Sequence, residues 1–486
     1  MKLTPISVQL TYYNYMVTDA VIKAFEDDLS VTPLEYEAGR AGYMWAVNIL
    51  FRYLYRPGPF QVDMPSLLEM KDNNFKLYFS FTPQEVKKSL NYFLNDGGKG
   101  VEDEISMRSE AAIARMQDCD VHNREALADA FADYFVIVQH LHHCAVYLRK
   151  VDRGIIAAVN KEFGSLASDI LSHCNVSERP GFFVQESLTL ARAACESGSE
   201  DIRTLAEDVY AHFSHITLGY YNEQARSLEY YIEKLQVLRE LDAQSELEKN
   251  TAEHTERLRE RDEFIQKYPA HEKLIMAIGE SAWLKDYYKF SANRAQAVAE
   301  IMWQQAAFHT SLPAKYLKTL MHDDLDTVLR GRPLDRERVS AYNAHSIFII
   351  KTESYSAHYT GSEAAELERH FLHVEAENST EFKGRPACKG KAQGKVVVVL
   401  SPDDFAKVNS GDIIVVQNTS PDFVPVLSKV AAIVAEEGGI TAHVSVISRE
   451  MKVPAVVGIS GVTKRLKDGD NVVVDATAGI VTVLRT

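Results

Sequence analysis

The spacing of the apolar residues changes once along this chain of 486 residues, and that change limits the folds open to it. Up to about residue 380, apolar residues recur every three or four positions, as in REALADAFADYFVIVQHLHHCAVYLRKV (124–151). This spacing places them on one face of an α-helix. Beyond that point they form short β-branched runs such as KVVVVL (395–400), which are typical of buried strands. The sequence therefore predicts a multidomain α + α/β protein, with a large all-α region (1–380) followed by a compact α/β domain (381–486).

One stretch of the helical region has a different composition. Residues 223–267 alternate positive and negative charges around a thin apolar stripe. This pattern predicts a pair of long exposed helices, which together form a charged helical arm. We interpret the arm as a solvated structure without a chemical role.

Composition excludes several classes of function. The formal net charge of −15 argues against a nucleic-acid partner and against binding to an anionic membrane surface. The N-terminus lacks the basic and apolar segments of an export signal, and no stretch reaches 18 apolar residues, so we expect a cytoplasmic protein. The five cysteines form no CxxC pair, and we expect neither disulfides nor a metal site. His140, His143 and Cys144 share a helical spacing that a metal site could use, but no carboxylate or further cysteine is arranged around them.

The stretch AAIVAEEGGITAHVSVISREM (431–451) passes from an apolar strand through two glycines into a helix. We expect Thr441 to be the N-cap, which leaves His443 in the first turn. Free backbone N–H groups and the positive end of the helix dipole meet there, and Gly438 and Gly439 allow an anion to approach closely. Neutral imidazole is a nucleophile near pH 7, so His443 is placed to carry a phosphoryl group. A first-turn histidine that is only a satisfied polar group remains the alternative.

The same residues resemble a known signature. GGITAHVSVISREMKVPAVVG (438–458) is similar to the phosphohistidine motif of the phosphoenolpyruvate-utilising enzymes, which include phosphoenolpyruvate synthase, pyruvate phosphate dikinase and rifampin phosphotransferase. GKAQGKVVVV before it and LKDGDNVVVDATAGIVTV after it also match, whereas Ala442 stands where serine is common. The resemblance implies a swivelling phosphohistidine domain with His443 as its catalytic residue. Gly438, Gly439, Thr441 and Arg449 then bind phosphate, with a plain surface salt bridge as the alternative for Arg449.

The helical region resembles the substrate domain of the synthase and rifampin-phosphotransferase branch more weakly. FSHITLGYYNEQ (213–224) is similar to its G-H-x-R-P-G-x-Y segment and retains His215, Gly219 and Tyr221, but lacks the first glycine, the arginine and the proline. Residues 283–331 resemble its R-E-x-x-K helix and the L-x-x-D-L turn. The resemblance implies that the three retained residues bind the phosphoryl acceptor, and His215 could position or deprotonate it. A core histidine is the alternative.

The sequence shows neither the strand-rich, Gly-loop pattern of an ATP-grasp domain nor a G-x-x-x-x-G-K-[ST] motif. The resemblance therefore implies a dikinase-like phosphotransferase component of a split phosphoenolpyruvate synthase type. A partner ATP-grasp subunit would bind ATP and Mg²⁺, and this chain would bind no cofactor of its own. The acceptor is a small molecule, and the sequence leaves open whether it is pyruvate, an alcohol, an amide or an apolar compound.

Two alternatives remain. The chain could be a non-enzymatic phosphocarrier or regulatory protein, in which the phosphorylated domain docks against the helices. It could also be a scaffold that kept the fold and lost the reaction. The first enzyme of the bacterial phosphotransfer system is a less similar relative, because its phosphohistidine domain precedes a phosphoenolpyruvate barrel.

Overall fold

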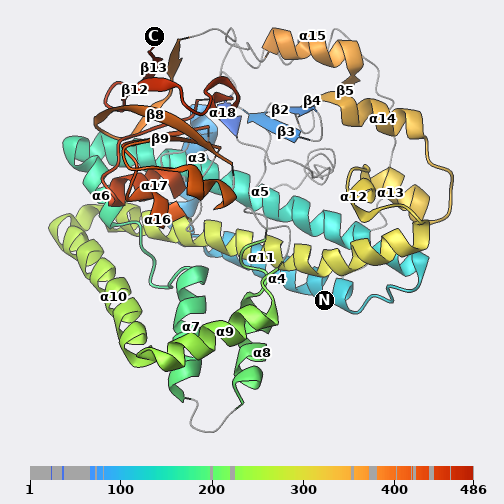
Figure 1. The fold of residues 1–486 in the computed structure, drawn as a ribbon, viewed down its shortest axis with the longest axis horizontal. Coiled ribbons are helices and arrows are strands. Elements are labelled where there is room, and N and C mark those ends of the chain that lie inside the picture. Colours follow the sequence, from blue (N-terminus) through green and yellow to red (C-terminus); the bar gives the residue numbers. More distant parts are fainter. Residues whose placement is uncertain are drawn as a thin grey trace.

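The computed structural model describes a large helical region followed by a mixed-sheet domain, in the order that the sequence predicts (Figure 1). Neither the long helices nor any other helix among the described residues combines the length and apolar character that crossing a membrane requires. The described residues are 23, 35–37, 66–71, 74–79, 81–196, 201–218, 225–351, 355–371, 380–400, 402–417, 419, 423–436, 443–459 and 461–484.

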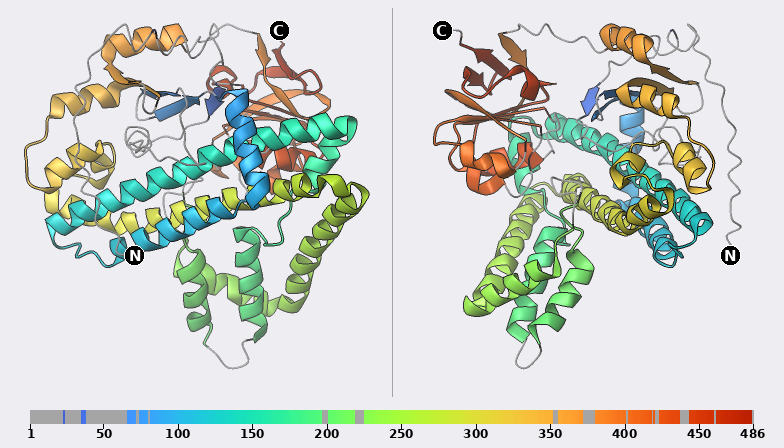
Figure 2. Two further views of the ribbon diagram at one scale, coloured as in Figure 1. Left: turned by 180° about the vertical axis from the view of Figure 1, so that it is seen from behind. Right: turned by 45° about the vertical axis from the view of Figure 1, so that its right-hand side comes forward.

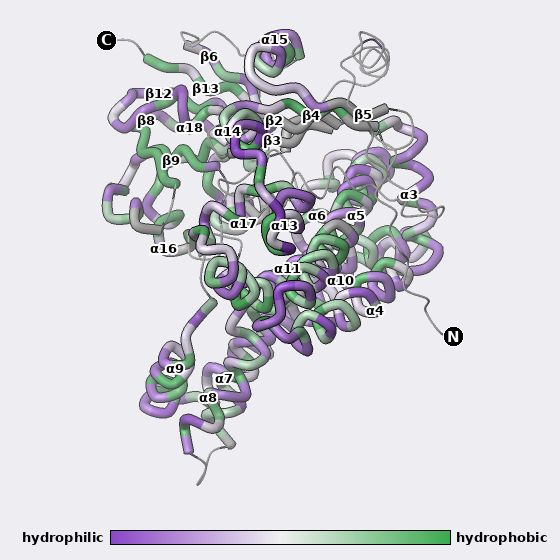
Figure 3. Tube along the Cα trace, turned by 90° about the vertical axis from the view of Figure 1, so that its right-hand side faces the viewer, coloured by the Kyte–Doolittle hydropathy of each residue, from purple (hydrophilic) through white to green (hydrophobic). Residues whose placement is uncertain are grey.

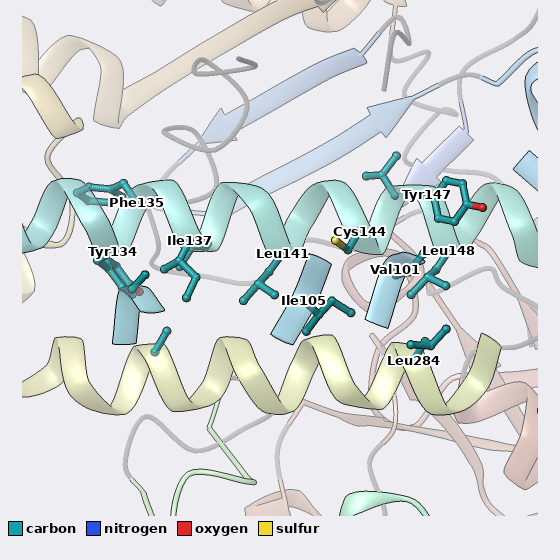
Figure 4. Close-up of a cluster of buried hydrophobic side chains, with 14 of the residues drawn as sticks. Val101, Ile105, Tyr134, Phe135, Ile137, Leu141, Cys144, Tyr147, Leu148 and Leu284 are labelled. Carbon is teal, nitrogen blue, oxygen red and sulfur yellow. The ribbon is translucent and has the colours of Figure 1, made fainter. Parts of the chain in front are cut away.

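Two long antiparallel helices, α5 (Arg124–Phe163) and α11 (Glu272–Thr310), form the axis of the helical region. Their facing side chains build one apolar core with α3 (Pro83–Asp96) and α4 (Lys99–Gln117), and Figure 4 shows Leu141 and Leu284 in it. The start of α5 is capped locally, since Asn123 accepts hydrogen bonds from the Glu125 and Ala126 N–H groups. The remaining helical segments are the 3₁₀ turns Gly164–Leu166 and Pro269–His271, α6 (Ala167–His173), α7 (Phe182–Glu196), α8 (Ile202–Phe213), α9 (Leu228–Glu240), α10 (Ala243–Lys267), α12 (Ala314–Leu317), α13 (His322–Leu329), α14 (Arg336–Ala344) and α15 (Gly361–Phe371).

The helices α7, α8 and α9 form a small bundle, which lies below the C-terminal domain in both panels of Figure 2. Its core includes Phe213, Tyr231 and Leu235. The residues predicted to form a charged helix pair are α9 and α10. However, α9 buries Tyr231 and Leu235 completely, so this half of the arm contributes to a core. Figure 3 shows how far the bundle projects from the remainder of the structure.

The first 380 residues also contain a sheet, so the expectation of an all-α region needs this correction. Five antiparallel strands lie in the order β1-β3-β2-β4-β5. Three come before the helices and two after them, and β2 pairs with β4 across nearly the whole region. Short strands whose partners are so distant leave no clear period in the sequence. The strands are β1 (Glu35–Glu37), β2 (Ser66–Lys71), β3 (Asn74–Phe79), β4 (His345–Lys351) and β5 (Tyr355–Thr360).

The C-terminal domain is an eight-stranded mixed sheet in the order β6-β13-β12-β8-β9-β10-β11-β7. The four strands β8 to β11 are parallel and central, and every residue of β9, β10 and β11 is buried. One apolar cluster covers each face of the sheet, which explains the uninterrupted β-branched runs. The strands are β6 (Glu381–Lys383), β7 (Arg385–Cys388), β8 (Lys391–Val399), β9 (Ile413–Val416), β10 (Ala432–Ala435), β11 (Ala455–Val457), β12 (Asn471–Asp475) and β13 (Ile480–Val483).

Short helices connect these strands. They are the 3₁₀ segment Pro402–Lys407, α16 (Val424–Leu427), α17 (His443–Glu450) and α18 (Val462–Arg465). Helix α17 contacts α6 of the helical region, and the two helices lie side by side in Figures 1 and 3. The C-terminal domain therefore touches the helical region through the helix that begins with His443.

Candidate functional site

His443 is the first residue of α17, as its predicted first-turn position requires. The other predicted phosphate-binding residues of this motif, Gly438, Gly439 and Thr441, lie outside the described residues. The helix follows β10, one of the parallel strands. The carboxyl edge of parallel strands is where α/β sheets commonly bind their ligands, so His443 follows the edge of the sheet at which such chemistry occurs.

Buried side chains hold α17 in place. Val444 and Ile447 belong to the apolar cluster on one face of the sheet. Ser445 and Ser448 are also buried, and the Ser448 hydroxyl donates to the Ser445 carbonyl at 3.1 Å. After the helix, the Val453 N–H donates to the Ser448 carbonyl at 2.8 Å. The amino end of α17 is therefore a fixed source of positive potential.

Arg449 lies six residues after His443 on the same helix, about 9 Å further along its axis. Its guanidinium is half-buried and donates to the Ala387 carbonyl of β7 at 3.4 Å. Burial raises the pKa of the neighbouring Cys388 thiol, and the charge of Arg449 acts in the opposite direction. This contact joins α17 to the edge strand β7. A role of Arg449 in binding phosphate stays a prediction.

His215 follows α8 and is buried in the α7–α9 bundle, with 3% of its surface exposed. Its ring lies 4.5 Å from that of Phe290 on α11. Burial, assisted by the charges of Arg294 and His212, lowers the pKa of His215 to about 4, so the ring is neutral at pH 7. Within the described part of the chain its Nε2 atom makes no hydrogen bond. Gly219 and Tyr221, predicted to act with it, lie outside the described residues.

The helix that resembles the R-E-x-x-K segment is α11. Its Lys285 ammonium pairs with Asp152 of α5 at 2.6 Å, and the Ser281 hydroxyl donates to the same carboxylate at 2.6 Å. In the L-x-x-D-L turn, the buried carboxylate of Asp324 accepts hydrogen bonds from Arg338 and from the Tyr342 hydroxyl. These residues form polar contacts that link elements of the helical region to one another.

In the histidine-rich segment of α5, which was considered as a metal site, His140 contacts other protein groups. His140 lies 3.3 Å from a carboxylate oxygen of Glu104 and 3.9 Å from the Cys144 sulfur. Across the part of the chain that the structure describes, no three or more His, Cys, Asp or Glu residues are grouped so that they could hold a metal ion.

Two polar residues at the edge that leads to His443 were not singled out from the sequence. Thr419 is buried three residues after β9, and Glu436 is buried directly after β10. Glu436 stands beside Glu437 in the sequence, and nothing in their spacing distinguishes the two. The burial of Thr419 and Glu436 depends on which strands lie next to each other in the sheet.

Comparisons with known proteins agree with this geometry. Residues 408–479 match the family described as "PEP-utilising enzyme, mobile domain". A probable phosphoenolpyruvate synthase of Archaeoglobus fulgidus is 42% identical over 151 residues, which are 31% of this chain and 19% of that protein. The phosphoenolpyruvate synthase of Escherichia coli is 34% identical over 149 residues, 31% of this chain and 18% of the relative. The chain therefore spans less than a fifth of the length of these two relatives.

Among solved structures, the solution structure of an Enzyme I protein is 14% identical and covers 64% of this chain and 83% of that chain, with a TM-score of 0.17. Both of these sequence alignments exceed the length of residues 381–486, so they include residues that precede the C-terminal domain. Within the C-terminal part of this chain, residues 408–479 are thus similar to the mobile domain of phosphoenolpyruvate-utilising enzymes.

Proposed function

We propose that this chain is a phosphotransferase component that carries a phosphoryl group on His443 and passes it to a small-molecule acceptor bound by the helical region. The observation that supports this most directly is the place of His443. It is the first residue of a helix that follows a central parallel strand, inside the segment that matches the mobile domain. The resemblance of this segment to phosphohistidine domains supplies the type of reaction.

The proposed reaction has two steps. An imidazole nitrogen of His443 attacks the phosphorus of the donor, a P–N bond forms, and the P–O bond to the leaving group breaks. An oxygen of the acceptor then attacks the same phosphorus, and the P–N bond breaks as the proton of the acceptor goes to a base or to water. Phosphoryl transfer depends mainly on positioning and on stabilising negative charge, and the amino end of α17 offers positive potential for this.

The arrangement of the two regions supports transfer between them. Helix α17 contacts α6, so the carrier helix already lies against the helical region. His215 lies in a different part of the helical region, the bundle of α7, α8 and α9, which is below the C-terminal domain in both panels of Figure 2. Delivery to an acceptor beside His215 therefore requires the C-terminal domain to swing, which is the motion implied by its likeness to swivelling domains.

The donor in this proposal is ATP bound with Mg²⁺ by an ATP-grasp partner, because the sequence shows no ATP-binding pattern of its own. We assign no cofactor to this chain. We place the reaction in the cytoplasm, since all five cysteines are free thiols, as is usual in reducing compartments.

The first prediction is that His443 carries the phosphoryl group. The purified chain is incubated with an ATP-grasp protein from the same organism and ATP radiolabelled on its β or γ phosphate. We expect the wild type to acquire acid-labile label, since the P–N bond of phosphohistidine hydrolyses in acid. His443→Ala should acquire none, whereas His122→Ala, which changes an exposed histidine of the helical region, should label normally.

Undiminished labelling of His443→Ala would contradict the assignment. Phosphorus NMR with pyruvate and with alcohols as acceptors then identifies the product. If the labelled protein is stable and transfers to none of them, the regulatory phosphocarrier is the better description of the chain.

A further inference from the structure

One face of α11 meets the amino end of α7 through aromatic side chains. The ring of Phe182, the first residue of α7, stacks on that of Phe290 at 4.1 Å and on that of Tyr287 at 5.9 Å. The Trp283 ring lies 5.1 Å from the Tyr287 ring. Residues 283, 287 and 290 share one face of the helix because of their spacing. We call this contact between α7 and α11 the aromatic seam.

An acidic residue lies within the aromatic seam. Asp286 comes three residues after Trp283 and four before Phe290, so it is on the same face of α11, and it is exposed to solvent. A Cβ atom on Gly181, the residue before α7, would lie 3.1 Å from the Asp286 Oδ2 atom. The carboxylate is therefore beside the amino end of α7, where the absence of a side chain on Gly181 leaves space for it.

Asp286 has no protein partner in the part of the chain that the structure describes, where it makes neither a hydrogen bond nor an ion pair. Other carboxylates near the seam differ in this respect. Asp152, Glu186 and Glu280 each accept hydrogen bonds from protein side chains. Asp286 is thus available to accept a hydrogen bond or a proton from a bound molecule.

The surroundings of Asp286 affect its basicity. Solvent reaches the residue, yet protein atoms surround it closely enough that desolvation raises the pKa of its carboxyl. The charges of Lys289 and Lys285 act in the opposite direction and favour the ionised form. Arg179, which lies beside the seam, is paired with Glu280. A carboxylate with a raised pKa binds a proton more strongly, which makes its ionised form a better general base.

His215 is less suited to take a proton from the acceptor. Its Nε2 atom is buried, and burial lowers the pKa of the ring to about 4. The ring lies 4.5 Å from that of Phe290, and Asp286 is one helical turn before Phe290 on α11. Asp286 is therefore close to the place predicted for the acceptor and, unlike His215, is open to solvent.

We infer that Asp286 is a catalytic residue of the second step, in which its carboxylate takes the proton of an acceptor alcohol with an aromatic body. The inference rests on the proposed function. The alcohol oxygen attacks the phosphorus of phospho-His443, the O–P bond forms, and the P–N bond breaks with its electron pair remaining on the imidazole. The alcohol proton passes to Asp286 and from there to water. The aromatic rings on either side of Asp286 favour an aromatic body in the acceptor.

The test starts from chain labelled at His443 and separated from the donor, with benzyl alcohol as the probe and ethanol for comparison. We expect the wild type to transfer label to benzyl alcohol at lower concentrations than to ethanol. Asp286→Asn keeps the shape but takes no proton, so its rate at saturating benzyl alcohol should fall about 100-fold, with the half-saturating concentration changed by less than about twofold. Asp208→Asn, which removes an exposed carboxylate from α8, is the matched control and should transfer at the wild-type rate.

The dependence of the transfer rate on pH separates a base from a structural residue. After subtraction of hydrolysis without alcohol, the wild-type rate should fall as the pH drops below the pKa of Asp286, because the protonated carboxyl accepts no further proton. Asp286→Asn should be slow without this fall. Gly181→Ala places a Cβ atom against the carboxylate, and we expect about a fivefold slower transfer. An equal fractional loss at every pH in Asp286→Asn would contradict the inference.

Carbon-13 NMR of chain with labelled aspartate carboxyl groups tests Asp286 without an acceptor. The Asp286 signal is the one missing from Asp286→Asn. We expect it to titrate above the usual aspartate pKa of about 3.9, and the usual value would overturn the inference.

The remaining outcomes separate the inference from the proposed function. A wild type that takes no label at His443 contradicts the proposed function. If the labelled wild type transfers and Asp286→Asn transfers equally fast, only the role of Asp286 is wrong. If the labelled wild type transfers to neither alcohol, an aromatic alcohol is the wrong acceptor, and the NMR titration decides whether Asp286 can act as the base.

Discussion

At the scale of single residues, the helical region contains histidines that are neutral because they are buried. Burial lowers the pKa of His215 to about 4, and it does the same for His142 and His358. Such a ring can accept or donate a hydrogen bond at neutral pH but attracts an anion poorly. If His215 contacts the acceptor, it therefore does so as an uncharged group.

These pKa values predict how stability depends on pH. The unfolded chain binds the proton of His215 near pH 6.5 and the folded chain only near pH 4. The free energy of unfolding should therefore be highest above pH 6.5 and fall as the pH drops towards 4, by up to about 3 kcal/mol for this group. Urea unfolding at several pH values measures the change.

The variant His215→Leu removes the titrating group, so its stability should fall less steeply between pH 6.5 and 4. His122→Gln changes an exposed histidine and should keep the wild-type slope. An unchanged slope in His215→Leu would show that the pKa of His215 is not lowered by burial.

At the scale of elements, the segment between α6 and α7 is fixed along α11. A Cβ atom on Gly279 of α11 would lie 1.9 Å from the Val176 carbonyl oxygen, so only glycine allows this close approach. The approach brings the Ser177 hydroxyl within 3.0 Å of Glu280 and places the Arg179 guanidinium 3.4 Å from the centre of the Trp283 ring. The segment thus connects the helix that α17 contacts to the bundle that contains His215 in a defined way.

Gly279→Ala should destabilise the chain although alanine favours helices. The gain from helix propensity is about 1 kcal/mol. Contact with backbone atoms at this distance forces the segment away and costs about 1–3 kcal/mol or more. We expect the cost to prevail, together with a weaker α6–α17 contact, and urea unfolding measures the net effect.

Ala282→Gly is the control on the same helix, and it should lose only the propensity difference of about 1 kcal/mol. If Gly279→Ala were instead more stable than the wild type, the close packing of α11 against this segment would be wrong.

At the scale of the whole molecule, the C-terminal domain has its own core. All members of its two apolar clusters come from residues 382–481, and the described strands of its sheet pair only with one another. Helix α17 of this domain contacts α6 of the helical region. A carrier domain needs this combination, because it has to leave one surface and reach another without unfolding.

Residues 380–486 should therefore fold when produced alone. We expect a cooperative thermal transition by circular dichroism and a dispersed amide NMR spectrum, because the domain buries its strands without help from the helices. The isolated domain should also accept label at His443. A disordered fragment would contradict this prediction, and the full-length chain serves as the reference for both measurements.

Much of the C-terminal domain could be predicted from the sequence. Buried parallel strands read as continuous β-branched runs, and the two glycines before His443 predict the start of a helix. The described part of α17 begins at His443, and Thr441, the predicted N-cap, lies outside the described residues. The roles of Gly438, Gly439, Thr441 and Arg449 stay predictions, because they come from the sequence pattern and the resemblance.

By itself, the sequence determined the kind of element that the long helices and the C-terminal strands form, because helices and strands repeat with fixed periods that local side-chain patterns reveal. The short strands β1 to β5 lack such a pattern. Only the tertiary structure decided which segments meet. The pairing of β2 with β4, the bond of Lys285 to Asp152 and the bond of Glu436 to Thr463 all join groups that are distant in the chain. Such contacts depend on the shape and charge of two complementary surfaces, and no spacing within one segment records its partner.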